Sequence, residues 1–226
     1  MDTQKLLHKA VMRTAMSFLI AGAILFIAAD TWRYWQAWLF FAVFAALSGR
    51  ACRYMLKKAP HLLEKRIGGP LSERSGEQRL IQILSSVFVI CLFALSGWDY
   101  GTHGPRLPWM AVLGAECLVI LGHLLFQAVV RENRFAAATV EVQCDQTVID
   151  TGPYLLVRHP MYSSAILIAF ATPLALASLW GLLPAVLFVV AIVIRLLREE
   201  RYLHENLPGY RAYCARVRFR LIPYVW

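Results

Sequence analysis

Two polar stretches of the sequence carry residues that could do chemistry, and each adjoins an uncharged run. The first, TGPYLLVRHPMYSS at residues 151–164, places Arg158 and His159 directly before Pro160, with Tyr162 two positions further on. A residue before proline disfavours the helical region, so we predict that a helix begins at Pro160 with His159 at its N-cap. Free backbone amides and the positive end of the helix dipole would lie there, which suits a carboxylate.

The second stretch, residues 195–226, begins where the last uncharged run ends. Arg195, Glu199 and Tyr202 follow at i, i+4 and i+7, so we expect them on one face of a helix. Taken alone, these charges could be a salt-bridged helix end that keeps its charged groups in water, and His159 could be a simple interfacial cap. Together, the two stretches would suit a zwitterionic ligand with hydroxyls and an aromatic ring.

The elements that must position these residues are membrane helices. The chain has 226 residues, of which 59% are hydrophobic and only 16% are charged. Residues 14–29, 35–49 and 80–98 carry no charge, and residues 107–130 carry only Glu116 and His123. Residues 161–194 are uncharged but too long for one span, and their prolines favour a tight hairpin. We predict an all-α integral membrane protein with six membrane segments, because backbone groups in lipid must be satisfied within a helix.

The net charge is +9, and the basic residues are distributed unevenly between the connections of these segments. Of the 23 lysines and arginines, 21 fall in the N-terminal region and residues 50–79, 131–158 and 195–220, whereas the two remaining connections hold only Arg33 and Arg106. This asymmetry predicts that both termini are cytoplasmic, at the inner membrane if the protein is bacterial. Four tryptophans would form an aromatic belt at the opposite face: Trp32, Trp35, Trp98 and Trp109. The charge is therefore attributed to topology and anionic lipid, and not to nucleic acid.

The sequence divides into two regions by polarity. Residues 1–130 are predicted to be transmembrane helices with a basic cytoplasmic loop at 50–79, and residues 131–226 hold the varied polar residues of a catalytic region. Within the second region, residues 138–150 (ATVEVQCDQTVID) alternate loosely and are predicted to be extended. The five cysteines have neither a CxxC pattern nor metal-ligand spacing, so we expect reduced thiols and no metal site.

The order of these motifs is similar to that of a known family. GPYLLVRHPMY, an uncharged hairpin, RLLREERYL, YRAYCARV and a final RLIPY resemble the isoprenylcysteine carboxyl methyltransferase family over roughly the last ninety residues. That family belongs to a wider group of membrane methyltransferases that includes phospholipid N-methyltransferases. The resemblance implies an enzyme that binds S-adenosylmethionine from the cytosol in a pocket capped by the C-terminal segment. A lipophilic acceptor would reach the pocket laterally from the bilayer.

The resemblance also implies roles for individual residues. Arg195 corresponds to the arginine that holds the acceptor carboxylate, and we take Arg195 and His159 as the catalytic residues. The family often has serine where Met161 stands, and a Phe-Gly turn where this chain has Leu207-Pro208-Gly209. By motif position, the cofactor contacts would be Gln143, Gln146, Thr147, Val148, Ile149, Tyr154, His159, Pro160, Met161, Tyr162 and Glu199.

The favoured function is methyl transfer to a lipophilic acceptor, above all to the carboxylate of an isoprenylcysteine-like molecule. A carboxylate needs no general base, because it is already ionised. The alternatives are phospholipid N-methylation and methylation of a small thiol. Either of these would need deprotonation, with His159 or Glu200 the nearest candidates.

Glu116, His123 and Gln127 lie on one face of the span at 107–130 and allow other interpretations. Ionisable groups inside a membrane usually face a cavity, so Glu116 and His123 could line the acceptor side of the methyltransferase pocket. They could also line the path of a transporter, although the sequence has no internal repeat. A third interpretation is a hydrogen-bonded interior pair that fixes helix packing. Two other classes of protein are possible from the sequence. One is a non-catalytic membrane scaffold, and the other is a sterol-reductase-like enzyme that uses a nicotinamide cofactor.

Overall fold

The computed structural model describes residues 3–67, 76–133, 135 and 146–226. Every regular element in these ranges is helical, in agreement with the all-α prediction. In chain order the elements are α1 (Thr3–Ala29), α2 (Trp35–Lys58), α3 (Pro60–Ile67), α4 (Gly76–His103), α5 (Trp109–Glu132), the 3₁₀ turn η2 (Gly152–Leu155), α6 (Pro160–Ala175), α7 (Leu182–Asn206) and α8 (Tyr210–Arg216).

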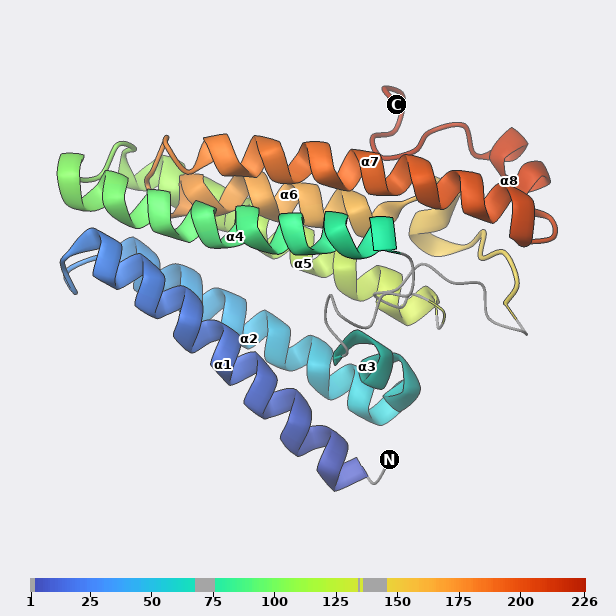
Figure 1. Ribbon diagram of the computed structural model, residues 1–226, viewed down its shortest axis with the longest axis horizontal. Coiled ribbons are helices and arrows are strands. Elements are labelled where there is room, and N and C mark those ends of the chain that lie inside the picture. Colours follow the sequence, from blue (N-terminus) through green and yellow to red (C-terminus); the bar gives the residue numbers. More distant parts are fainter. Residues whose placement is uncertain (1–2, 68–75, 134, 136–145) are drawn as a thin grey trace.

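The long helices alternate in direction along the chain (Figure 1). The connections α1–α2, α4–α5 and α6–α7 lie at one end of the bundle. The short elements α3, η2 and α8 lie at the other end, together with the start of α6, and this end is called the site end below (Figure 1). At the opposite end, the four tryptophans of the predicted belt are all at least partly exposed, with Trp32 at 71% and Trp109 at 62%.

Four helices, α1, α2, α4 and α5, are long and apolar enough to cross a membrane, which indicates a multi-pass membrane protein. The predicted hairpin is present as α6 and α7, but its two arms are unequal. The apolar helix α6 has 16 residues, fewer than the roughly 20 that a perpendicular span needs. The second arm, α7, has 25 residues, apolar as far as Ile194 and charged beyond it. The charged residues from Arg195 onward therefore belong to the same helix as the second arm of the hairpin.

A buried carboxylate at the end of α4 fixes the turn of the hairpin. Asp99 is fully buried, and its Oδ2 accepts hydrogen bonds from Ser178 Oγ at 2.7 Å, Leu179 N at 3.0 Å and Trp180 N at 3.2 Å. Its other oxygen lies 3.3 Å from Arg106 Nε. Because the turn is tied to α4 in this way, α6 and α7 return to the site end in a defined register.

Small residues allow the helices to approach closely. A Cβ atom at Gly97 would lie 2.3 Å from the carbonyl oxygen of Leu25, so α1 and α4 can pack at this distance only with glycine there. At Gly122, a Cβ atom would lie 2.6 Å from the side chain of Ile168 on α6. Close backbone contact through small residues is the usual way in which membrane helices associate.

The expected basic loop at residues 50–79 is largely helical where the structure describes it. Helix α2 continues to Lys58, and α3 follows after one residue. Leu62, Leu63 and Ile67 are buried in a core cluster that also contains Val129 and Val130 of α5. The prediction of a loop was wrong because it considered only the charges, whereas these three apolar residues give α3 a face that packs against the bundle.

Candidate functional site

A cavity of about 320 Å³ lies at the site end. Its lining residues come from α3, α4, α6, α7, α8 and η2, and from residues 133, 135, 146–149, 158, 159 and 207. Both halves of the chain therefore contribute to it. The division into a helical membrane region and a catalytic region remains a prediction, but the described site is not confined to residues 131–226.

Most of the predicted cofactor residues lie in the walls of this cavity. Pro160 begins α6 and is buried, but it does not line the cavity, and Gln143 lies outside the described residues. Arg195, the predicted acceptor residue, also lines it. The predicted cofactor residues in the lining are Gln146, Thr147, Val148, Ile149, Tyr154, His159, Met161, Tyr162 and Glu199.

The start of α6 has the predicted local structure. His159 is the N-cap of the helix, and Pro160 is its first residue. The imidazole does not bond the backbone of its own helix as a capping side chain would. Residues 146–150, at the end of the stretch predicted to be extended, have no regular secondary structure, and residues 138–145 lie outside the described part.

Tyr162 connects α6 to α7 across the cavity. Its hydroxyl donates a hydrogen bond to Glu199 Oε2 and accepts one from Arg195 Nε at 3.1 Å. Arg195 and Glu199 therefore share the cavity face of α7, as their spacing predicts. Tyr202 does not line the cavity and is 37% exposed, because the lining face of α7 continues through Leu203 instead.

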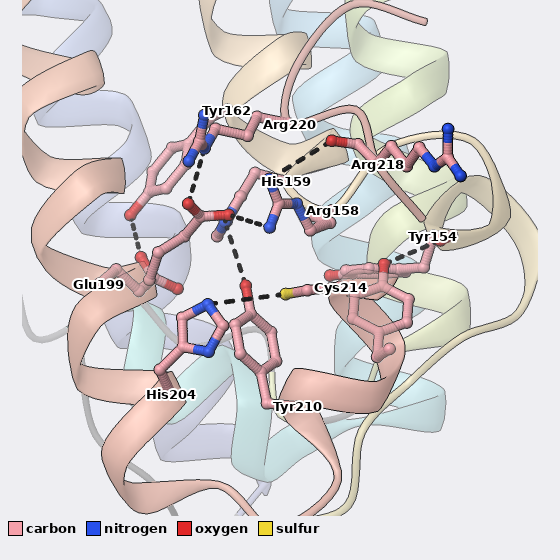
Figure 2. A network of polar contacts seen from close by, with 12 residues as sticks. Tyr154, Arg158, His159, Tyr162, Glu199, His204, Tyr210, Cys214, Arg218 and Arg220 are labelled. Carbon is pink, nitrogen blue, oxygen red and sulfur yellow. Dashed lines mark hydrogen bonds and ion pairs between the residues drawn. The ribbon is translucent and has the colours of Figure 1, made fainter. Parts of the chain in front are cut away.

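Glu200, the neighbour of Glu199, has a different set of partners, and Figure 2 labels three of them, Arg158, His159 and Arg220. Its Oε1 lies 3.1 Å from Arg158 Nη1 and 3.3 Å from His159 Nε2, and its Oε2 accepts a hydrogen bond from Arg220 Nε at 2.7 Å. We call Glu200, Arg158, His159 and Arg220 the Glu200 clasp. Burial favours the neutral acid, but the hydrogen bonds with His159 and Arg220 outweigh it and lower the pKa of Glu200 from 4.5 to about 2. Glu200 is therefore a firmly held carboxylate and a poor general base.

The C-terminal residues complete the clasp through their backbone. Arg158 N donates to the carbonyl of Phe219 at 2.9 Å, and His159 N donates to that of Arg220 at 3.0 Å. Ser163 Oγ donates to the carbonyl of Leu221 at 2.7 Å. Residues 158–163, which lead into α6 and form its first turn, are thus paired with residues some sixty positions later in the chain.

Tyr154 of η2 is held by hydrogen bonds from two separate segments, the end of α5 and α8. Asn133 Nδ2 donates to its hydroxyl at 2.8 Å, and the hydroxyl of Tyr213 donates to its backbone carbonyl at 2.8 Å. Burial raises the pKa of Tyr154 to about 12, so the phenol stays protonated at neutral pH. Tyr154 can therefore offer a neutral ring and a hydroxyl to a bound molecule.

Glu116 and His123, predicted to bind the acceptor, are buried on α5 but are not among the residues that line the cavity. His123 Nδ1 lies 3.0 Å from the carbonyl of Val119, and Phe44 packs edge-on against its ring. Neither carboxylate oxygen of Glu116 has a hydrogen-bond partner among the described residues, so the two side chains do not form the interior pair considered above. Gln127, on the same face, bonds Arg50 and the carbonyl of Leu47 instead.

Several lining residues were not predicted from the sequence. Gln82 and Ser85 are polar and three positions apart within the uncharged run at 80–98, a spacing that could have marked an inward face. Arg66 of α3 was counted only as part of the basic loop. Tyr210 and Tyr213 of α8 lie within the motif YRAYCARV, but their inward orientation depends on how α8 packs.

The arrangement suits an organic ligand of mixed polarity. Aliphatic walls alternate with hydroxyls, amides, one carboxylate and several guanidinium groups. The volume is at the lower end of the usual range for small-molecule sites, about 300–1,000 Å³. In the described part of the chain, no group of three or more His, Cys, Asp or Glu side chains could hold a metal ion.

The fold and the cavity together define a multi-pass helical membrane protein with a pocket of mixed polarity at one end. Residues 109–208 match the family model described as phospholipid methyltransferase, which covers somewhat less than half of the chain. No curated protein matches the chain. The matched region extends from the start of α5 to just beyond α7, and it includes residues 151–164 and the spacing of Arg195, Glu199 and Tyr202, but not residues 209–226. The match supports a relation to membrane methyltransferases in general, and it does not single out the isoprenylcysteine carboxyl methyltransferases.

Proposed function

We propose that this protein is a membrane S-adenosylmethionine-dependent methyltransferase that acts on a lipophilic acceptor. One observation carries the proposal. All the described residues assigned to the cofactor from motif order, except Pro160, line a single cavity within a region similar to phospholipid methyltransferases.

The cavity fits the proposed cofactor in chemistry. Glu199 and Tyr162 can bind hydroxyl groups, and the first turn of α6 can hold a carboxylate. Val148, Leu203 and the ring of Tyr154 offer surfaces for an aromatic base. When bound, S-adenosylmethionine supplies an activated methyl group, and the protein has only to orient the acceptor and exclude water.

We favour a carboxylate as the methyl acceptor. Arg195 lines the cavity beside Tyr162 and Glu199, and its guanidinium could orient an anionic group. A carboxylate acceptor needs no general base, and Glu200 is not suited to act as one. That side chain is held by two arginines, and its low pKa makes it a poor proton acceptor.

A phospholipid amine is the second candidate, and the family match at residues 109–208 favours it. An amine must lose a proton during methylation, and of the two bases considered from the sequence His159 fits this role better than Glu200. A transporter that uses Glu116 and His123 would place its path away from the described cavity.

Cofactor binding is the first test. Isothermal titration of the detergent-purified protein should give saturable binding of S-adenosylmethionine and S-adenosylhomocysteine, and none of NADPH. Glu199→Ala should weaken this binding about tenfold to a hundredfold, since it removes a hydrogen bond to a charged group. Glu205→Ala, an exposed change on the same helix, is the matched control and should have no effect. If folded protein bound neither adenosyl compound, the methyltransferase proposal would fail.

The acceptor can then be identified with N-acetyl-S-farnesylcysteine and phosphatidylethanolamine as test substrates. Arg195→Ala should raise the KM for a carboxylate acceptor and leave the affinity for S-adenosylhomocysteine unchanged. Methylation of phosphatidylethanolamine alone would refute the carboxylate assignment in favour of the amine.

A further inference from the structure

Residues 222–226, with the sequence IPYVW, form an apolar surface at the site end, and we call them the apolar turn. All of them are exposed, with Tyr224 at 88% and Val225 at 73%, whereas the preceding Leu221 is buried. In water, such a run of exposed apolar residues is unfavourable unless another surface covers it. The apolar turn therefore requires an apolar partner outside the fold.

The chain directly before the apolar turn shields its large apolar side chains from water. Between residues 203 and 221, all of which the structure describes, none of these side chains is exposed; they are Leu203, Leu207, Tyr210, Tyr213, Val217, Phe219 and Leu221. Most of them pack together in one cluster around α8. The exposure of the apolar turn is thus a local feature, and not a property of the whole C-terminal region.

The apolar turn lies at the level where the hairpin changes from uncharged to charged. Ser163, in the first turn of α6, donates a hydrogen bond to the carbonyl of Leu221 at 2.7 Å. The uncharged stretch at residues 161–194 ends at Arg195, which lies beside Tyr162. After α8 the chain turns back along α7 towards the middle of the bundle (Figure 1). The residues that follow Leu221 are therefore at the boundary of the apolar part of the bundle.

The chemistry of the apolar turn fits the headgroup boundary of a bilayer. Tyrosine and tryptophan are enriched there, because their rings are apolar and their O–H or N–H groups can stay in contact with water. The turn also pairs its own backbone, since the amides of residues 220–222 donate to the carbonyl oxygen of Trp226 at 2.9, 2.9 and 3.1 Å. Internal pairing of this kind is what a backbone needs next to lipid.

Neighbouring residues extend the same surface. Leu155 and Leu156 are 63% and 60% exposed, and they line a hollow of about 170 Å³ together with Tyr224. Arg218, which is also exposed, lines this hollow. Basic side chains close to a bilayer are attracted to anionic headgroups. An apolar patch with a basic residue beside it is thus complementary to lipid in both respects.

We propose that the apolar turn is a membrane anchor, which lies in the headgroup boundary of the surrounding bilayer at the site end. Its partner is therefore lipid, and not a second copy of the chain. The carbonyls of residues 219–221, directly before the anchor, accept hydrogen bonds from Arg158, His159 and Ser163. The anchor thus attaches the start of α6 to the membrane surface. This inference does not depend on the reaction that the cavity supports.

The test is photo-cross-linking of the full-length protein in phosphatidylcholine nanodiscs. Each variant carries p-benzoylphenylalanine in place of one residue, and mass spectrometry measures the phospholipid attached after irradiation. Tyr224 is the main position, because it is aromatic and its side chain is exposed, and Val225 is the second. Val190, exposed on the apolar part of α7, is the positive control. Glu205, exposed about 15 Å beyond Arg195 along the same helix, is the negative control.

The anchor predicts phospholipid adducts at positions 224 and 225 that exceed those at 205 by about tenfold or more, the ratio expected when an aromatic side chain prefers lipid to water. An adduct at either position, at the level found at 190, supports the inference. Only the background of position 205 at both, with labelling at 190, would overturn it. A cross-link to a second copy of the chain would also overturn it, and would assign the turn to a contact between copies.

The variants replace exposed side chains, so each should have the Tm of the unaltered protein, which shows that it is folded. Failure of the proposed function is distinguishable from failure of this inference. The labelling needs no S-adenosylmethionine, and a protein that bound no adenosyl compound would still give the adducts.

Discussion

Glu200→Gln is the change that best tests the structure of the site, because it removes one charge and almost no volume. Glu200 is 5% exposed, and it joins α7 to Arg158, just before α6, and to Arg220 near the C-terminus. Glutamine can still accept a hydrogen bond, but it cannot balance the charges of Arg158 and Arg220. The expected effect is lower stability of the whole site end.

The size of this effect can be worked out in two ways. Removing one partner of a buried ion pair costs about 3–5 kcal/mol, and partial access of water to Arg220, which is 32% exposed, reduces that figure. A shift in the pKa of Glu200 from 4.5 to about 2 corresponds to about 3 kcal/mol at 1.36 kcal/mol for each pKa unit. We therefore expect the free energy of unfolding to fall by about 2–4 kcal/mol, and Tm to fall by roughly 5–15 °C.

The assay is thermal unfolding of the purified protein in one detergent at neutral pH, with Glu205→Gln as the exposed control on the same helix. A double-mutant cycle with Arg220→Met should give a coupling energy above about 0.5 kcal/mol, since the two side chains are in contact. If Glu200→Gln lowered Tm no more than Glu205→Gln does, the clasp would not stabilise the protein and our account of it would be wrong.

Further predictions concern pH and the hairpin turn. The pKa of Glu200 is lower in the folded protein than in the unfolded chain, so its contribution to stability is present above pH 4.5 and is lost as the pH falls towards about 2. Over that interval Tm should fall more steeply in the unaltered protein than in Glu200→Gln, and parallel curves would contradict this. Asp99→Asn should lower the free energy of unfolding by about 1–3 kcal/mol, because it weakens charge-assisted hydrogen bonds to the turn at Ser178. Asp30→Asn, an exposed change at the same end, is its control, and an equal effect of the two would count against the anchoring role of Asp99.

The membrane helices and the start of the hairpin were predictable because each depends on neighbours within one segment. Long uncharged runs must become helices in lipid, where the backbone has no other hydrogen-bond partners. The position of Pro160 likewise determines where α6 begins, and the spacing of Arg195 and Glu199 puts them on one face of α7. Motif order then assigned a set of residues between 146 and 199, and the fold brings all of these except Pro160 into one cavity.

Other features depend on contacts between distant segments, which local patterns do not encode. Glu199 and Glu200 are adjacent and chemically identical, yet one faces the cavity and the other meets Arg220 at the far end of the chain. Glu116 had the properties of a cavity residue, but the packing of α5 buries it away from the described pocket.

The sequence by itself thus determined the class of fold, four of the six predicted membrane segments and the local geometry at the start of α6 and along α7. Only the tertiary structure decided which charges meet. Arg66, separated from Met161 by 95 positions, reaches the site because the apolar face of α3 packs against the end of α5. The physical reason is that helix periodicity and capping act over a few residues, whereas the pairing of buried charges depends on how whole helices pack.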